Sequence, residues 1–278
     1  MKRPSGATQV AAVIGHPVRH SLSPVLHNAA FEACDLDWVY VALDVEPGAA
    51  PAALTGVRAL GIRGLNVTMP HKTDVAHAVD RLTPEAQALD AVNCVTNHDG
   101  DLIGHNTDGP GFVDSLRAEG IDVHAMACVV LGAGGAARAV VRSLADAGAR
   151  EVVVVNRTAG KAAVAAALAD GVGRVGSTAD LAGADLIVNA TSVGMGDPAT
   201  SAALPLEPHV LRAGQVVADL VYHPLETGLL VAARQAGATP VGGLGMLVHQ
   251  AGRAFSLWTG VAAPIDTMMD AALAHLAR

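Results

Sequence analysis

Polar side chains that could bind a ligand or take part in catalysis occur in short groups within the first 110 residues. Ser21 and Ser23 are two positions apart, so in an extended segment both hydroxyls face the same side. Asn66 and Thr68 alternate in the same way at the end of an apolar run, and Lys72 follows within about one turn. Hydroxyl and amide groups can hydrogen-bond a small polar ligand, and an ammonium group can stabilise negative charge on a reacting oxygen.

A third group supplies an amide at Asn93 and a carboxylate at Asp108. Each of these residues also has a simpler interpretation. Asn93 and Asp108 could be turn residues, Lys72 could be a surface cation, and Ser23, which precedes Pro24, could cap a helix. All three groups nevertheless lie at the ends of predicted strands, and open α/β sheets bind ligands beyond the carboxyl ends of their strands.

A glycine-rich loop in the second half of the chain suggests a cofactor. Residues 132–137 read Gly-Ala-Gly-Gly-Ala-Ala, directly after the apolar run 129–131 and before a predicted helix. Gly132 would permit the tight turn, Gly134 would let a pyrophosphate approach the backbone, and Ala137 would let the helix pack on the strand. The free amides at the start of the helix would bind the phosphates. A merely structural turn is the alternative.

The end of the next strand indicates which dinucleotide binds. Proteins that bind NAD usually place Asp or Glu there, for the ribose 2′-hydroxyl. Here the predicted strand 151–155 is followed by Asn156, Arg157 and Thr158. Arg157 could form a charge-assisted bond to a 2′-phosphate, and its neighbours could add neutral donors. The segment therefore favours NADP, although Arg157 could also be a solvated loop residue.

A nicotinamide cofactor implies hydride transfer, and a ketone that accepts hydride gains negative charge on its oxygen. Lys72, as an ammonium, could stabilise that charge and donate a proton. The sequence leaves open whether Lys72 transfers the proton or only stabilises the charge.

Apolar runs that alternate with amphipathic segments predict two α/β series. In the first series we expect strands at 10–14, 38–45 and 62–67, helices at 24–34 and 52–60, and a hairpin around Asp99-Gly100. A connecting helix is expected at 109–119. In the second series we expect strands at 127–131, 151–155, 186–189, 216–219 and 240–241, with helices at 135–147, 159–168 and 227–236.

Nothing after Gly243 resembles another strand–helix unit, so we expect the last two predicted helices, 246–259 and 265–276, to fold back onto the first domain. The fold class is therefore α/β. We predict a substrate-binding and catalytic domain over residues 1–110, completed by 244–278, and a Rossmann-type NADP-binding domain over 111–243.

Composition argues against several other classes of protein. The chain of 278 residues has a net charge of −8 and no run of Lys and Arg, so nucleic acid is not an expected partner. No uncharged apolar stretch reaches the ~18 residues of a membrane span, so no membrane is expected. The first nine residues lack the apolar stretch of a signal peptide. Three cysteines without a Cys-x-x-Cys pair suggest reduced thiols and a cytoplasmic location.

Twelve histidines raise the question of a metal site. His16 and His20 are four residues apart, but Pro17 lies between them and no carboxylate or cysteine occurs nearby at ligand spacing. We therefore predict no metal.

Eight short segments together resemble the shikimate dehydrogenase family, and the resemblance runs from about Val13 to Thr259. In chain order they are His-Ser-Leu-Ser-Pro at 20–24, Asn-Val-Thr-Met-Pro-His-Lys at 66–72, Ala-Val-Asn at 91–93, Asn-Thr-Asp-Gly at 106–109, Gly-Ala-Gly-Gly-Ala-Ala-Arg at 132–138, Asn-Arg-Thr at 156–158, Asn-Ala-Thr-Ser-Val-Gly-Met at 189–195 and Gly-Gly-Leu-Gly-Met-Leu-Val-His-Gln at 242–250.

This resemblance implies NADP-dependent interconversion of 3-dehydroshikimate and shikimate, a step of chorismate and aromatic amino acid biosynthesis. It implies that Lys72 and Asp108 are the catalytic pair, and that Ser21 and Ser23 hold the substrate carboxylate. It implies substrate contacts through Ser21, Ser23, Asn66, Thr68, Lys72, Asn93, Asp108, Tyr222 and Gln250. For the cofactor it implies Gly132, Ala133, Gly134, Gly135, Ala136, Asn156, Arg157, Thr158, Thr191, Ser192, Met195, Leu220 and Gly243.

One position departs from the family pattern: Cys94 stands where a hydroxyl residue is common, and we expect it to be accommodated by packing. Three alternatives remain open. They are a quinate/shikimate dehydrogenase that prefers NAD, a relative that acts on an amino or deoxy analogue of the same ring, and a non-catalytic NADP-binding regulator. The expected assembly is a monomer or a homodimer.

Overall fold

The structure is a computed structural model that describes residues 3–196 and 201–277. It consists of two compact units. Unit 1 contains the residues up to Thr107 and those from Val248 onward, and unit 2 runs from Asp108 to Leu247. The predicted boundaries, at 110/111 and 243/244, fall a few residues away from these. The C-terminal helices belong to the first unit, as the sequence predicted.

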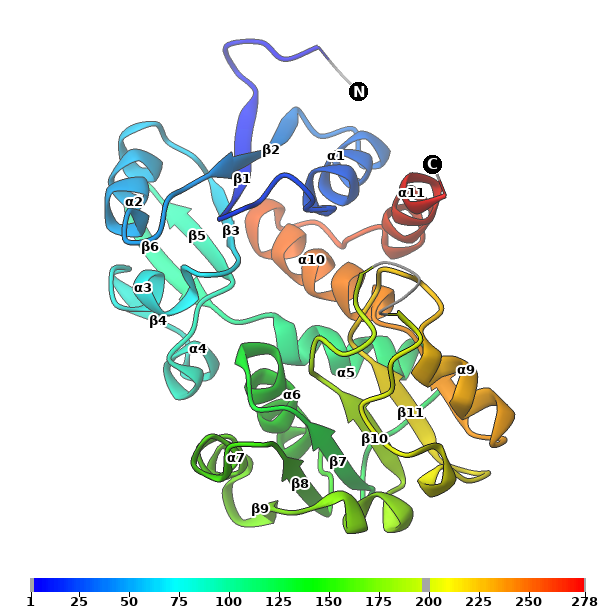
Figure 1. Ribbon diagram of the computed structural model, residues 1–278. Helices are drawn as coiled ribbons and strands as arrows, with labels where there is room; N and C mark the ends of the chain where they lie inside the picture. Colours follow the sequence, from blue (N-terminus) through cyan, green and yellow to red (C-terminus); the bar gives the residue numbers. More distant parts are fainter. Residues whose placement is uncertain (1–2, 197–200, 278) are drawn as a thin grey trace. The chain divides into compact units, whose positions relative to one another are not determined.

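Unit 1 is built on a sheet of six strands in the order β2-β1-β3-β5-β6-β4 (Figure 1). The strands are β1 (Gln9–Gly15), β2 (Trp38–Asp44), β3 (Gly64–Val67), β4 (Arg81–Leu82), β5 (Cys94–His98) and β6 (Asp101–His105). β1 runs parallel to β2 and β3, whereas β5 is antiparallel to both β3 and β6. The carboxyl ends of β1, β3 and β6 therefore meet the amino end of β5 at one edge of the sheet.

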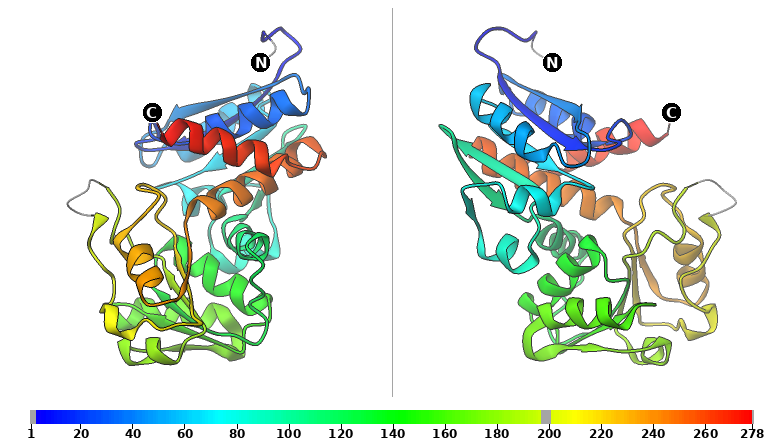
Figure 2. Two further views of the ribbon diagram at one scale, coloured as in Figure 1. Left: turned by 90° about the vertical axis from the view of Figure 1, so that its right-hand side faces the viewer. Right: turned by 60° about the vertical axis from the view of Figure 1, so that its left-hand side comes forward.

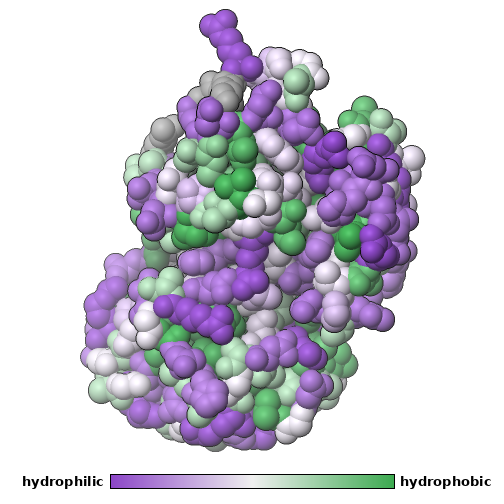
Figure 3. All heavy atoms as spheres, turned by 180° about the vertical axis from the view of Figure 1, so that it is seen from behind, coloured by the Kyte–Doolittle hydropathy of each residue, from purple (hydrophilic) through white to green (hydrophobic). Residues whose placement is uncertain are grey.

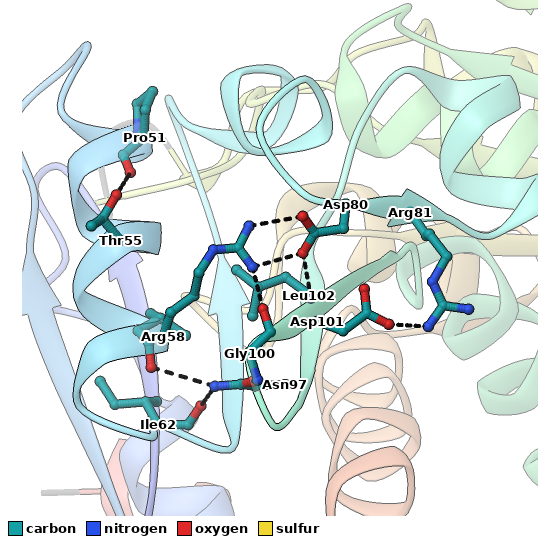
Figure 4. A network of polar contacts seen from close by, with 11 residues as sticks. Pro51, Thr55, Arg58, Ile62, Asp80, Arg81, Asn97, Gly100, Asp101 and Leu102 are labelled. Atoms are coloured by element: carbon teal, nitrogen blue, oxygen red, sulfur yellow. Dashed lines mark hydrogen bonds and ion pairs between the residues drawn. The ribbon is translucent and has the colours of Figure 1, made fainter.

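The predicted hairpin is confirmed. β5 and β6 are joined by Asp99 and Gly100, with φ of 54° and 101°. Figure 4 shows how the far end of the hairpin is held: Arg58 donates to the carboxylate of Asp80 at 2.6 Å and to the carbonyl of Gly100. Asp80 in turn accepts the Leu102 N–H at 2.7 Å. These contacts fix the hairpin at the end opposite the predicted site residues.

Helices cover both faces of this sheet. They are α1 (Ser23–Ala33), α2 (Ala50–Ala59), α3 (Lys72–Ala76), α4 (Pro84–Leu89), α11 (Ile265–Leu276) and the larger part of α10 (Leu244–Thr259). Leu54 and Val57 of α2 form one core with Ile14 and Leu65. On the other face α1 packs against α11 (Figure 2), and Gly64 leaves room for the ring of Trp258.

Most of the chain's aromatic side chains lie on the sheet face that α1, α10 and α11 cover. Both tryptophans, one of the two tyrosines and two of the three phenylalanines lie there. Phe31 contacts Trp38 and Phe255 with ring centroids 5.3 and 5.4 Å apart. In a chain with only 3% aromatic residues, this concentration gives the face a large buried apolar area.

Unit 2 has a sheet in the order β12-β11-β10-β7-β8-β9, and every strand pair is parallel. The strands are β7 (Ala127–Leu131), β8 (Glu151–Val155), β9 (Gly173–Val175), β10 (Leu186–Asn189), β11 (Val216–Asp219) and β12 (Thr239–Val241). Counted within the unit the order is 3-2-1-4-5-6, which is that of the Rossmann fold. The predicted fold class is confirmed.

Alternate residues of these strands face two cores. Val130 and Val154 pack with Ala137 on the side of α5 (Asp108–Ala118), α6 (Gly135–Asp146) and α7 (Ala159–Ala166). Val129 and Val153 pack on the other side, with α9 (Gly228–Gln235) and the 3₁₀ turn at Thr178–Gly183. Both faces are buried, which explains why these strands read as continuous apolar runs.

Several short elements were not predicted from the sequence: α3, α4, β4, β9 and the 3₁₀ turns Ala167–Val172, Thr178–Gly183 and Pro208–Val210. They span too few residues to show a hydrophobic period.

Hydrophilic and hydrophobic side chains are interspersed over the surface of each unit seen in Figure 3. Within residues 3–196 and 201–277, no helix combines the length and apolar character needed to cross a bilayer.

Candidate functional site

The predicted substrate residues of unit 1 follow the strand ends that meet at one edge of its sheet. Ser21 and Ser23 come after β1, and Asn66 and Thr68 lie at the end of β3. Lys72 is the first residue of α3, and Asn93 directly precedes β5. Strand direction therefore gathers residues that are separated by dozens of positions in the sequence.

Hydrogen bonds join three of these residues. The Asn66 side-chain amide donates to the carbonyl of Asn93 at 3.1 Å, and the Asn93 amide donates to Oε1 of Gln250 at 3.4 Å. Gln250 lies on α10, 157 residues further along the chain than Asn93. Helix α10 thus supplies a side chain to the same edge of the sheet.

Asn93 and its neighbour Val92 bond to the two segments that carry the predicted catalytic residues. Its Oδ1 accepts the N–H of Thr107 at 2.7 Å, and its Nδ2 donates to the Thr107 hydroxyl at 2.9 Å. Asp108 is the next residue in the chain, is largely buried, and begins α5 in unit 2. On the other side of Asn93, the N–H of Val92 donates to the carbonyl of Lys72 at 2.9 Å.

Ser23 is not the helix cap that one interpretation suggested. It is the first residue of α1, the cap position is Leu22, and no side chain caps the helix. Instead, the N–H of Ser23 donates to the hydroxyl oxygen of Ser21 at 3.3 Å.

Cys94, which stands where a hydroxyl residue is common in the family, is accommodated inside the sheet. Its thiol is fully buried opposite Asn66.

The glycine loop of unit 2 has the geometry of a phosphate-binding turn. Gly132 has a φ of +109°, and an added Cβ would lie 2.9 Å from the carbonyl oxygen of Ala190, so only glycine fits. Gly134 caps α6, and nothing lies within 4 Å of a Cβ built there. The first helical bond runs from Arg138 to Gly134, so the amides of residues 135–137 precede it and remain available to an anion.

The loop after β8 presents a cation. Arg157 is exposed and forms no hydrogen bond or ion pair with any residue in the described part of the chain. The Asn156 amide donates to the carbonyl of Thr158 at 3.1 Å and thereby closes the turn around it. Together with the open glycine turn after β7, this loop suits a dinucleotide that carries an additional phosphate.

A buried network organises the loops that follow β10 and β11. Oδ1 of Asn189 accepts the hydroxyl of Thr191 at 2.7 Å, while its amide donates to Asp219 at 2.9 Å. Asp219 also accepts the Thr227 hydroxyl at 2.7 Å. Burial raises the pKa of Asp219, and the hydrogen bonds from Thr227, Val221 and Asn189 oppose that effect. The network was missed from the sequence, although Asn189 belongs to one of the eight motifs.

The other predicted residues of unit 2 also follow carboxyl strand ends. Thr191, Ser192 and Met195 come after β10, Leu220 after β11, and Gly243 after β12. An added Cβ at Gly243 would lie 2.8 Å from the carbonyl oxygen of Val221, so the loops pack closely here. Tyr222 is half-buried, and this burial raises the pKa of its phenol above its ordinary value.

Known protein families match the chain along most of its length. The family of the shikimate dehydrogenase substrate-binding domain matches residues 13–95, shikimate/quinate 5-dehydrogenase matches 116–194, and the shikimate 5′-dehydrogenase C-terminal domain matches 243–273. The NADP⁺ shikimate dehydrogenase of Moorella thermoacetica is 46% identical, over 94% of this chain and 92% of its own length. The chain belongs to the shikimate dehydrogenase family.

Further relatives agree with this membership. The NADP⁺ shikimate dehydrogenase of Methanopyrus kandleri is 47% identical over 97% of this chain and 96% of its own. The crystal structure of shikimate 5-dehydrogenase from Thermus thermophilus, in complex with NADP(H) and shikimate, superposes with a TM-score of 0.90 at 41% identity. That superposition covers 96% of this chain and 99% of the Thermus chain. The resemblance stated from the eight motifs is confirmed.

No group of three or more His, Cys, Asp or Glu side chains within the described ranges is arranged to hold a metal ion.

One histidine is unusual in its burial. His27, on α1, is fully buried, and its ring nitrogens have no hydrogen-bond partner of good geometry among the described residues. Burial lowers its pKa to about 3, and nearby Asn66 opposes this shift only in part.

His27 makes the stability of this family member depend on pH. In the unfolded chain the ring takes up a proton near pH 6.5, whereas in the folded chain it stays neutral down to about pH 3. The unfolded state therefore binds more protons between these values, and the free energy of unfolding falls as the pH falls through this window. From pH 7 to pH 5 this group alone removes about 2 kcal/mol.

Urea unfolding of the wild type and of His27→Phe at pH 7 and pH 5 tests this dependence. The variant is expected to lose about 2 kcal/mol less stability over that range than the wild type. His275→Gln, at an exposed histidine on α11, serves as the control and should keep the wild-type difference. Equal pH dependence in His27→Phe and the wild type would show that this ring is not the group responsible.

Proposed function

We propose that this chain is an NADP-dependent shikimate dehydrogenase, which reversibly reduces 3-dehydroshikimate to shikimate in aromatic amino acid biosynthesis. The observation that carries the proposal is the set of hydrogen bonds around Asn93, which links the segments of Asn66, Gln250, Lys72 and Thr107. These residues are the ones expected to contact substrate or to adjoin those that do, and the family membership gives the reaction.

The side chains at this edge of unit 1 suit a polyhydroxylated acid. In the proposal, the hydroxyls of Ser21 and Ser23 bind the carboxylate of the substrate. The amides of Asn66, Asn93 and Gln250 bind its ring hydroxyls, because an amide can both donate to and accept from a hydroxyl. Thr68, and Tyr222 of unit 2, are proposed to add further hydroxyl contacts.

Lys72 and Asp108 are proposed as the catalytic pair. NADPH, when bound, supplies the hydride that reduces the ketone. In the proposal, the Lys72 ammonium stabilises the negative charge that develops on the ketone oxygen and would give that oxygen a proton. Asp108 is the carboxylate of the proposed pair. In the oxidative direction Lys72 takes the proton back.

Unit 2 is proposed to bind the cofactor. The amides at the start of α6 would hold the pyrophosphate, and Arg157, with Asn156 and Thr158, would hold the 2′-phosphate. The segments at Thr191–Met195, Leu220 and Gly243 would line the nicotinamide. Gly132 supports this assignment, because its conformation and the close approach of Ala190 admit no side chain.

Location and assembly stay predictions. Cys34, Cys94 and Cys128 are free thiols, which fits the proposed cytoplasmic location. A monomer or homodimer is proposed for the assembly.

The proposed function is tested by following reduced nicotinamide spectrophotometrically with shikimate or quinate, each with NADP⁺ or NAD⁺. The highest kcat/KM is expected with shikimate and NADP⁺. A higher value with quinate and NAD⁺ would indicate a quinate/shikimate dehydrogenase instead. Turnover only with an amino or deoxy ring analogue would identify a different substrate, and the absence of any turnover would favour a regulator.

Lys72→Ala is expected to lower kcat by about 10²–10⁴-fold, the usual range for loss of a general acid, with a smaller change in KM for shikimate. Steady-state kinetics in both directions measure the effect. Arg81→Ala, which removes another cation of unit 1 that pairs with Asp101, should leave kcat unchanged. A large rise in KM at constant kcat would mean that Lys72 only binds substrate.

Arg157→Ala is expected to raise KM for NADP⁺ at least about 10-fold, because charge-assisted hydrogen bonds to a phosphate contribute about 1.5–3 kcal/mol. KM for NAD⁺, which has no 2′-phosphate, should not change. Arg234→Ala is the matched control, since it removes an exposed arginine of unit 2 that pairs with Glu226. Equal effects of Arg157→Ala on both cofactors would argue against a role at the 2′-phosphate.

A further inference from the structure

Tyr40 lies outside all eight sequence motifs, yet its hydroxyl reaches the proposed substrate site. The residue is on β2, and its side chain is 2% exposed on the sheet face covered by α1 and α10. Its ring stacks on His27, with centroids 4.4 Å apart and an interplanar angle of 11°. The ring of Trp258 lies 6.1 Å away. Packing therefore fixes the ring whether or not it carries a hydroxyl.

The hydroxyl of Tyr40 donates to Oδ1 of Asn66 at 2.7 Å. At the other end of the same amide, Nδ2 donates to the carbonyl of Asn93 at 3.1 Å. A donor facing Oδ1 and an acceptor facing Nδ2 together define which way the amide points. Asn66 is only 6% exposed, so solvent does not readily replace either partner.

The same hydroxyl is also adjacent to a second proposed substrate residue. Burial raises the pKa of Tyr40 well above its ordinary value, and the neighbouring side chain of Ser23 acts in the opposite direction. The phenol therefore stays protonated and remains a donor throughout the working range of pH. Ser23 and Asn66 belong to different elements, α1 and β3, and Tyr40 contacts both.

We propose that Tyr40 is a positioning residue for the substrate: its buried hydroxyl holds the Asn66 amide in the orientation that binds a ring hydroxyl, without touching the substrate itself. The inference rests on the proposed function. One N–H of Asn66 is used by Asn93, so the second N–H is the group left to meet the substrate. Removing the phenolic hydroxyl takes away the donor that fixes the direction of Oδ1 and frees the amide to rotate.

Tyr40→Phe tests the proposal, because it removes the hydroxyl and keeps the stacked ring. KM for shikimate is expected to rise about 10-fold, the effect of losing one buried hydrogen bond. KM for NADP⁺ should stay within about twofold of the wild type, because unit 2 supplies the proposed cofactor residues. An unchanged KM for shikimate would overturn the proposal.

Trp258→Phe is a matched control from the same aromatic cluster. The indole N–H of Trp258 donates to the carbonyl of Val95 at 3.0 Å, so this variant also loses a buried side-chain donor. Its partner is not a proposed substrate residue. Both variants should unfold at lower denaturant concentration than the wild type, but only Tyr40→Phe should raise KM for shikimate. An equal rise in both would mean that Tyr40 acts only through stability, which would overturn the proposal.

A double-mutant cycle with Asn66→Ala identifies the route of the effect. If Tyr40 acts through Asn66, adding Tyr40→Phe to Asn66→Ala leaves KM for shikimate nearly unchanged. A further 10-fold rise in the double variant would overturn the inference while the wild-type activity still supported the proposed function. No turnover of shikimate by the wild type would instead overturn the proposed function, and the inference with it.

Discussion

The arrangement of unit 1 depends on the hydrogen bonds made by the side-chain amide of Asn93. Asn93 is almost fully buried and directly precedes β5. Its side chain bonds to Thr107 and Gln250, and its backbone carbonyl accepts a hydrogen bond from the Asn66 side chain. A buried amide contributes to stability only when its donors and acceptors are paired, because an unpaired polar group in the interior is costly. The segments that pair with Asn93 are therefore held in one arrangement, and they carry Asn66, Gln250 and, next to Thr107, Asp108.

In unit 2 a buried asparagine likewise fixes the loops that follow the strands. Asn189 ends β10, binds Thr191 in the loop that follows, and reaches across to Asp219 at the end of β11. In both units a buried asparagine at a strand end converts a regular sheet edge into loops of defined shape. Asn189 does this beside a carboxylate whose pKa is raised mainly by burial, so the two polar groups depend on each other for hydrogen bonds.

Glycine and other small residues also fix these loops, because they let neighbouring segments approach closely. Gly132 turns the chain close to Ala190, and Ala137 lets α6 pack against Val130 and Val154. The start of α6 is thereby fixed next to the end of β7, at the point where the strand order of the sheet reverses. In unit 1, Gly64 similarly leaves room for the ring of Trp258, which packs α10 against β3. Tight packing and paired polar groups thus act on the same loops.

The sequence by itself determined the long elements, the glycine turn and the motif residues, because each depends on local patterning or on a special backbone conformation. β7, β8, β10, β11 and α11 have the predicted bounds, and the Asp99-Gly100 turn joins β5 to β6. Short elements such as α3 and β9 show no period and could not be predicted. Only the tertiary structure decided that Tyr40 and His27 lie beside Asn66 in unit 1 and that Asp219 binds Asn189 in unit 2. Their partners are distant in the sequence, and a hydrogen bond or a buried ring leaves no periodic signal along the chain.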